Sequence, residues 1–156
     1  MILVAGIGNI FFGDDAFGSE VARRLAYRPV PQHVHVVDFG IRGLDLVYAL
    51  LDGYDAVILI DATPRGGAPG TLYTIEPDLD ELSNTNAEME AHGMDPMRVL
   101  AVAQGMGANL KNVRLVGCEP AKLEHEDGYI GLSPEVGEAV DEAIRIIESL
   151  IEEAFV

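Results

Sequence analysis

Apolar residues along this chain form two kinds of pattern, short runs rich in apolar residues and stripes that recur every three or four positions. The runs predict strands of a buried sheet, and they are Ile2 to Ala5, Val34 to Phe39, Val57 to Ile60 and Val113 to Val116. The stripes predict amphipathic helices. Their members are Phe17, Val21 and Leu25; Leu44, Val47 and Leu51; Val99, Val102, Ala103 and Met106; and Val136, Val140, Ala143, Ile147 and Ile151. Strands therefore alternate with helices along most of the chain.

Two segments depart from this alternation. Residues 71–75 alternate apolar and polar positions after a turn-rich stretch, which predicts a strand with one wetter face at an antiparallel edge. Residues 76–95 are acidic and show no period, which predicts a long loop before Pro96 begins a helix. The whole pattern predicts one domain over residues 1–156: an α/β fold, a three-layer α/β/α sandwich with a mostly parallel twisted sheet, in which an antiparallel edge strand is possible.

Four polar or reactive residues are expected at one rim of this sheet. Ligands of such folds bind beyond the carboxyl ends of the strands, where Asp15, Asp61 and Cys118 each follow or end a predicted strand. His92 lies in the acidic loop, which is long enough to fold over the same rim. Two carboxylates and one imidazole suit a divalent metal such as nickel, zinc, manganese or cadmium, with open positions for water or substrate.

The three candidate metal ligands, Asp15, Asp61 and His92, could instead have only a structural role. Asp15, like its neighbour Asp14, could serve only to complement a helix N-terminus, which is worth about 0.3–1 kcal/mol. His92 taken alone is typical of a solvated loop histidine. Asp61 is harder to explain in this way, because an apolar strand places it at a buried edge where an unpaired carboxylate is costly.

A dinucleotide site is the first competing interpretation. Gly6-Ile7-Gly8-Asn9 follows a strand and precedes a helix, as the glycine-rich fingerprint does, but Phe11 occupies the position of the third glycine. Asp14 and Asp15 would also repel a pyrophosphate at the helix start. Asp38 could mimic a ribose-binding acid, yet it lies further along the chain than the usual spacing of about 20 residues. The sequence therefore disfavours a nucleotide ligand.

Cysteine and histidine offer two further alternatives. Cys118 and His92 could form a thiol nucleophile and its base, but the neighbouring Glu119 would raise the pKa of the thiol, and a small apolar residue suits a strand end. His33 and His35 alternate onto one face of the second strand and could bind a metal. On an edge strand they more often face solvent.

Charge and composition narrow the range of partners. The chain has 26 acidic and 10 basic residues, a formal net charge of -16, which disfavours nucleic acids and anionic membranes. A single cysteine excludes an internal disulfide, and neither a signal-type start nor an apolar run of roughly 20 residues is present. We therefore expect a cytoplasmic protein, and a monomer.

Several segments together resemble the hydrogenase maturation endopeptidases, which trim the C-terminal tail of nickel-iron hydrogenase large subunits. The most specific are Gly6-Ile7-Gly8-Asn9 and Gly13-Asp14-Asp15-Ala16-Phe17-Gly18, which are similar to the family's opening turn and acidic helix start. The others are Asp38-Phe39-Gly40 with Gly43, Ile60-Asp61-Ala62, Ala91-His92-Gly93-Met94, Val116-Gly117-Cys118-Glu119-Pro120 and Gly131-Leu132-Ser133-Pro134-Glu135. The resemblance covers nearly the whole chain. It departs at Ala16, where many relatives have glycine, and after His92.

The resemblance implies a function and a set of site residues. Asp15, Asp61 and His92 would be both the catalytic residues and the metal ligands of an endopeptidase that removes the C-terminal peptide of a nickel-loaded large-subunit precursor. The nickel would be supplied by the precursor, and zinc or cadmium could take its place in crystals. A nickel-sensing binding module or chaperone for the precursor, without proteolytic activity, would use the same ligands and stays an alternative.

Overall fold

The computed structural model describes residues 1–84, 95–121 and 130–154. Its strands are β1 (Ile2–Ile7), β2 (Val34–Gly40), β3 (Ala56–Ala62), β4 (Leu72–Ile75) and β5 (Val113–Cys118). Its helices are α1 (Phe17–Ala26), α2 (Gly43–Leu50), α3 (Pro96–Gly105) and α4 (Pro134–Glu153), with short 3₁₀ helices at Gly13–Ala16 and Leu79–Asn84. Every strand and helix that the apolar pattern predicts is therefore present.

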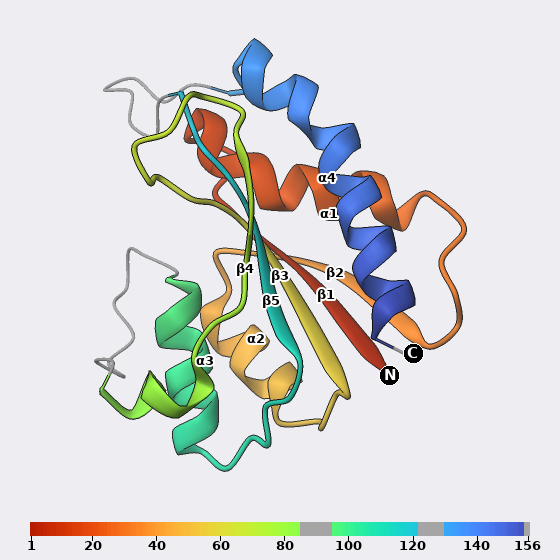
Figure 1. Cartoon of the computed structure of the whole chain (residues 1–156), viewed down its shortest axis with the longest axis vertical. Coiled ribbons are helices and arrows are strands. Elements are labelled where there is room, and N and C mark those ends of the chain that lie inside the picture. The colour runs from red at the N-terminus through yellow and green to blue at the C-terminus, as the bar shows by residue number, and fades with distance from the viewer. Residues whose placement is uncertain (85–94, 122–129, 155–156) are drawn as a thin grey trace.

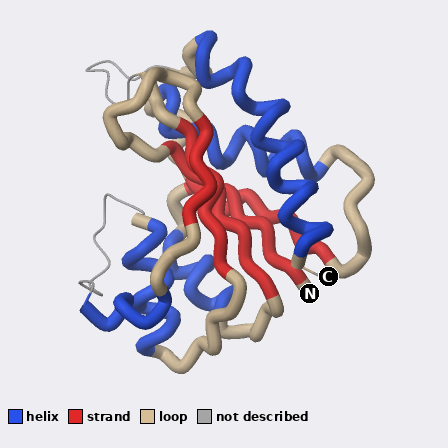
Figure 2. Tube along the Cα trace, viewed as in Figure 1, coloured by secondary structure: helices blue, strands red, loops and turns tan. Residues whose placement is uncertain are grey.

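The strands form one sheet in the order β2-β1-β3-β5-β4. The first four in this order pair in parallel, and β4 pairs antiparallel with β5 at the edge. Helices α1 and α4 cover one face of the sheet, and α2 and α3 cover the other (Figure 1). Figure 2 shows the strands in red between the two blue layers. The predicted sandwich, with its antiparallel edge strand, is confirmed.

The central strands are buried on both faces, which explains their unbroken apolar runs. All residues of β1 and β3 are buried. Because successive side chains point to opposite faces, Ile58, Ile60 and Ala62 pack in the cluster under α1 and α4. Val57 and Leu59 pack in the second cluster, under α2 and α3. The next position on this second face is Asp61.

Helix α4 is the longest helix of the described chain, with 20 residues. It buries the stripe that its sequence predicts, namely Val136, Val140, Ala143, Ile147 and Ile151. Acidic side chains occupy most of its outer face. Among the described residues, no helix combines the length and the apolar character that crossing a membrane requires.

For two residues, the prediction that they lie on the buried face of a helix is wrong. Leu44 of α2 is 55% exposed, and the helix instead buries Leu46, Val47 and Leu50. Leucine, valine and alanine occur on every side of this short helix, so periodicity alone does not fix which side faces the core. Met106 is 52% exposed, because α3 ends at Gly105 and the chain then leaves the helical path.

Candidate functional site

The carboxyl ends of β1, β3 and β5 lie side by side and form the predicted rim. Gly6 pairs with Ile60, Asp61 pairs with Gly117, and Ala62 pairs with Cys118. Asp15 lies in the 3₁₀ helix that follows β1. The prediction that Asp15, Asp61 and Cys118 share this rim is therefore confirmed, whereas His92 lies outside the described residues.

A tight turn holds Asp15 against the end of the sheet. The backbone N–H of Asn9 donates a hydrogen bond of 3.0 Å to Asp15 Oδ2, and the N–H of Asp15 donates to the carbonyl of Phe12 at 3.1 Å. Glycine at position 18 permits this placement, because a Cβ there would collide with the carbonyl oxygens of Ile7 and Ile60. The first turn of α1 thus lies directly on the ends of β1 and β3.

The environment of Asp15 disfavours its charged form. The side chain is half-buried, and this burial raises its pKa, while the hydrogen bond from Asn9 acts in the opposite direction. A carboxylate that served only to complement a helix start would remain well solvated. Burial of Asp15 therefore favours the functional interpretation over the structural one.

Asp61 ends β3 and is only 9% exposed. Burial raises its pKa well above the ordinary range, and the negative charge of Asp15 raises it further. The N–H of Ala62 lowers the pKa, and the charge of Asp95 adds to the upward shift. Among the described residues, the two charges that shift the pKa of Asp61, those of Asp15 and Asp95, are therefore both negative.

Asp95 is a third acidic residue near this rim that the sequence analysis missed. It is the N-cap of α3, where its Oδ1 accepts a hydrogen bond of 2.9 Å from the N–H of Met97. An Asp followed by Pro96 at a helix start was a usable signal for this cap. Its charge reaches Asp61 because α3 covers the face of the sheet to which Asp61 points.

The chemistry of these groups fits a divalent cation. Asp15 and Asp61 offer oxygen donors whose charges are disfavoured by burial, and for Asp61 also by repulsion, so a cation between them would relieve both costs. Within the described ranges, no three His, Cys, Asp or Glu residues converge as a metal site. The predicted third ligand, His92, is outside those ranges, so the complete ligand set stays a prediction.

Asp14 turns away from Asp15 and has a structural role. Its carboxylate is buried and accepts hydrogen bonds from the N–H of Ala121 at 2.8 Å, and from the N–H and hydroxyl of Ser133 at 2.7 and 2.8 Å. These contacts join the turn before α1 to the chain after β5 and to the start of α4. Asp14 therefore stabilises the fold, whereas its neighbour Asp15 belongs to the candidate site.

We expect Asp14→Ala to lower the free energy of unfolding by about 2–4 kcal/mol, because three donors lose their charged acceptor. Chemical denaturation measures the loss. The control is Glu138→Ala, an exposed acidic residue on α4, which should change stability by no more than about 0.5 kcal/mol. Equal stability of the two variants would contradict the structural role of Asp14.

Cys118 is unsuited to nucleophilic chemistry. Its thiol is fully buried in the cluster beneath α1 and α4, on the opposite face of the sheet from Asp61. Burial raises the pKa of Cys118 to about 12, and the charges of Asp14 and Glu119 act in the same direction. The predicted effect of Glu119 on this thiol is confirmed.

Glu119 itself is a buried carboxylate whose role the sequence analysis did not find. Tyr73 donates a hydrogen bond of 2.7 Å to Glu119 Oε1, and the N–H groups of Arg65 and Gly67 each donate to the same oxygen at 2.8 Å. The hydrogen bond from Tyr73 is the main reason that the pKa of Glu119 is lowered. Glu119 thus ties the loop after β3 to β4 at the edge of the rim.

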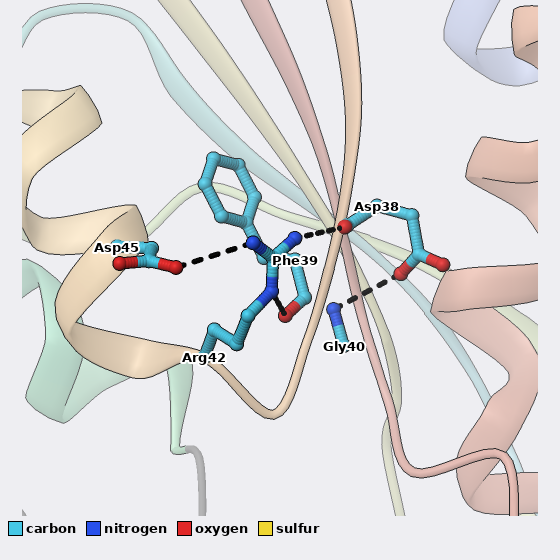
Figure 3. A network of polar contacts seen from close by, with 5 residues as sticks. All are labelled: Asp38, Phe39, Gly40, Arg42 and Asp45. Atoms are coloured by element: carbon cyan, nitrogen blue, oxygen red, sulfur yellow. Dashed lines mark hydrogen bonds and ion pairs between the residues drawn. The ribbon is translucent and has the colours of Figure 1, made fainter.

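Asp38 organises the loop after β2 instead of presenting a ribose-binding carboxylate. Its Oδ1 accepts a hydrogen bond of 3.0 Å from the N–H of Gly40 (Figure 3). Arg42 donates to the carbonyl oxygens of Asp38 and Phe39 at 2.8 and 3.2 Å and pairs with Asp45 at 3.2 Å. On the edge strand β2, His35 is exposed and contacts the Tyr54 hydroxyl at 3.1 Å, as expected for a solvent-facing histidine.

An open pocket of about 350 Å³ lies between the loops after β1 and β2. Ile10, Phe11 and Ile41 line it and are exposed, Phe11 to 61%, and we call these three side chains the apolar patch. Asn9, which holds Asp15, lines the same pocket. Exposed apolar side chains beside a site are typical of surfaces that bind other proteins or peptides.

Comparisons with known proteins identify the family of this chain. Residues 19–150 match the family model of the hydrogenase maturation proteases. The hydrogenase expression/formation protein HupD of Rhodobacter capsulatus is 35% identical over 92% of this chain and 70% of its own length.

Two solved structures are similar over almost their full length. The crystal structure of a hydrogenase 2 maturation peptidase from a Thaumarchaeota archaeon is 30% identical, with a TM-score of 0.75 and coverage of 97% of each chain. The Escherichia coli hydrogenase maturating endopeptidase HybD is 29% identical, with a TM-score of 0.80 and coverage of 98% of this chain and 93% of its own. Because the family model covers most of the chain, this protein belongs to the hydrogenase maturation protease family.

Proposed function

We propose that this protein is an endopeptidase that removes the C-terminal peptide of a nickel-loaded hydrogenase large-subunit precursor. The observation that carries the proposal is the pairing of Asp15 with Asp61 at the rim of the sheet. Both carboxylates are withdrawn from water, and the charge of Asp15 disfavours that of Asp61. A cation carried by the substrate would complete such a pair, and His92 is proposed as the third ligand.

The protein's own residues would perform two tasks in this reaction. Asp15 and Asp61 would bind the precursor's nickel from one side and so place the scissile bond at the rim. Bound nickel would polarise the carbonyl of that bond or lower the pKa of the attacking water. The proton that the water loses would pass to the departing amine nitrogen, so that cleavage leaves a new carboxylate on the large subunit and a free amine on the tail.

The surroundings of the site support a protein substrate. The pocket beside Asn9 is open, and the apolar patch is exposed at its edge. A small polar substrate gains little from such a surface, whereas an extended protein segment can place apolar side chains on it. This reasoning favours a large-subunit precursor over a free small molecule.

Mass spectrometry of the precursor tests the proposed function. Incubation of the nickel-loaded precursor with this protein should shorten it by one C-terminal peptide, and the released peptide should account for the missing mass. Precursor that keeps its full mass but binds the protein tightly would favour the alternative, a nickel-sensing binding module.

Cys118→Ser should leave the rate of precursor cleavage within about twofold of the wild-type rate. The thiol is buried, its pKa is raised to about 12, and it lies on the other face of the sheet from Asp61. The measurement is the initial rate of tail release from the nickel-loaded precursor. A folded variant without turnover would restore the thiol mechanism.

A further inference from the structure

A second pocket lies where α1 meets the chain that leads into α4. Its volume is about 350 Å³. The residues that bear on its chemistry are Ile10, Glu20, Arg23, Arg24, Ile130 and Leu132. Helices α1 and α4 lie against each other on the same face of the sheet (Figure 1). The mechanism proposed above uses none of the charged residues in this pocket.

The pocket holds a local excess of positive charge in a chain whose formal net charge is -16. Arg24 pairs with Glu20 at 2.9 Å, and Arg23 approaches the same carboxylate only at 3.6 Å. Two guanidinium groups therefore share one carboxylate. Arg28 differs from both, because it pairs with a carboxylate of its own, Glu148, at 3.1 Å.

Apolar side chains border these arginines. Ile130 is 79% exposed, Ile10 is also exposed, and Leu132 is half-buried. A ligand that matches this lining carries a negative group next to an apolar one. A peptide with an acidic side chain and an apolar neighbour has this chemistry, and guanidinium groups bind carboxylates with well-aligned hydrogen bonds.

The pocket lies close to the site at the rim, because Ala16, the neighbour of Asp15, is one of its lining residues. Ile10 lines both this pocket and the one beside the apolar patch, and it follows Asn9, whose N–H donates to Asp15. Arg23 lies eight residues after Asp15, or roughly 12 Å at the rise of a helix. An extended peptide covers that distance in about four residues.

We propose that this second pocket, the tail pocket, binds the C-terminal segment of the precursor that is to be removed. An acidic side chain of that segment contacts Arg23 and Arg24, and an apolar side chain packs between Ile10 and Ile130. This assignment rests on the proposed function. Contacts with the tail are lost once the tail is cut off, so they favour binding of the precursor over the mature subunit and assist product release.

Charge removal in the pocket tests the assignment. The double variant Arg23→Gln/Arg24→Gln should raise the KM for the nickel-loaded precursor roughly five- to tenfold and leave kcat within about twofold. The matched control is Arg28→Gln/Arg145→Gln, which removes two exposed guanidinium groups outside the pocket. The control should keep the wild-type KM.

A neutral tail supplies the second arm of the experiment. A precursor whose tail carries Asn and Gln in place of Asp and Glu should show the raised KM with the wild-type protein, and the double variant should raise it no further. Independent effects of the two changes, or a wild-type KM for the double variant, would overturn the tail pocket while the wild-type protein still cleaves. Failure of the wild-type protein to cleave any nickel-loaded precursor would instead overturn the proposed function, and the tail pocket with it.

Discussion

Asp61→Asn is expected to make the protein more stable at neutral pH while it removes precursor cleavage. Burial and the charge of Asp15 raise the pKa of Asp61 in the folded state, so ionisation of this side chain costs more free energy in the folded protein than in the unfolded chain. The amide has nearly the same shape without the charge. We expect a gain of about 0.5–2 kcal/mol in the free energy of unfolding.

The gain in the free energy of unfolding should depend on pH, and the raised pKa of Asp61 fixes the direction of this dependence. A folded-state pKa above the unfolded value means that the folded protein binds the proton more tightly, so wild-type stability falls as pH rises from the unfolded pKa, about 3.9 for Asp, through the folded one. Below that window both states are protonated. The advantage of Asp61→Asn should therefore be larger at neutral pH than in acid, and absent below the unfolded-state pKa.

Denaturation at pH 7 and in acid, together with cleavage assays, measures both effects. Asp141→Asn is the matched control, because Asp141 is an exposed aspartate on α4, and it should change stability by no more than about 0.5 kcal/mol. Cleavage by Asp61→Asn should fall at least roughly 100-fold. A variant that is less stable than the wild type at pH 7, or that keeps near-normal turnover, would contradict the assigned role of Asp61.

Asp15→Asn and His92→Ala should also abolish cleavage and leave the fold native by circular dichroism. In Asp15→Asn the side-chain oxygen can still accept the hydrogen bond from Asn9, so the turn before α1 should persist. The lost property is the negative charge. Near-normal turnover of either variant would remove that residue from the site.

The sheet and its rim could be predicted from the sequence because strands that are buried on both faces consist of apolar residues. Strands β1 and β3 are buried on both faces and have no polar residue before their ends, so Asp61 stands out as the first charge after an apolar run. The edge strand β4 is only partly buried: Leu72 packs against the cluster under α1 and α4, Ile75 packs against the cluster under α2 and α3, and Thr74 is exposed. Parallel order then places Asp15, Asp61 and Cys118 at one rim.

The direction in which each side chain points at the rim could not be predicted from the sequence. The consecutive residues Asp14 and Asp15 have the same chemistry, and only the structure shows that Asp14 accepts hydrogen bonds from Ala121 and Ser133 while the charge of Asp15 acts on Asp61. Asp95 approaches the site because α3 packs on the face to which Asp61 points. Contacts of this kind join residues far apart in the sequence, and no local pattern records them.

Cleavage should require nickel in the precursor. We expect this protein to cut the nickel-loaded precursor and to leave the same precursor intact before nickel insertion. Within the protein, the described part of the site offers Asp15 and Asp61, two carboxylates whose charged forms burial disfavours, and for Asp61 repulsion by Asp15 adds to this cost. A cation relieves that cost, whereas a precursor without one brings no positive charge to the two carboxyl groups.

The same argument predicts weak metal binding by the free protein. Two carboxylates and one imidazole leave coordination positions unfilled, and the precursor's own nickel ligands would fill them. Contacts to the ion and contacts between the two proteins then form together, so each makes the other more favourable. We therefore expect the purified protein to contain little metal, with zinc or cadmium able to bind only at high concentration.

Matched precursor samples, identical except for nickel insertion, provide the decisive comparison. Mass spectrometry should detect the released tail only from the loaded sample, and metal analysis of the free protein should find far less than one ion per chain. Asp15→Asn gives the internal control, since it should fail with both samples while it stays folded. Equal cleavage of both samples by the wild-type protein would refute recognition through nickel, even though the family assignment and the endopeptidase activity would stand. Absence of cleavage without nickel, restored when nickel is inserted, would show that the paired carboxylates test whether the precursor is ready to be processed.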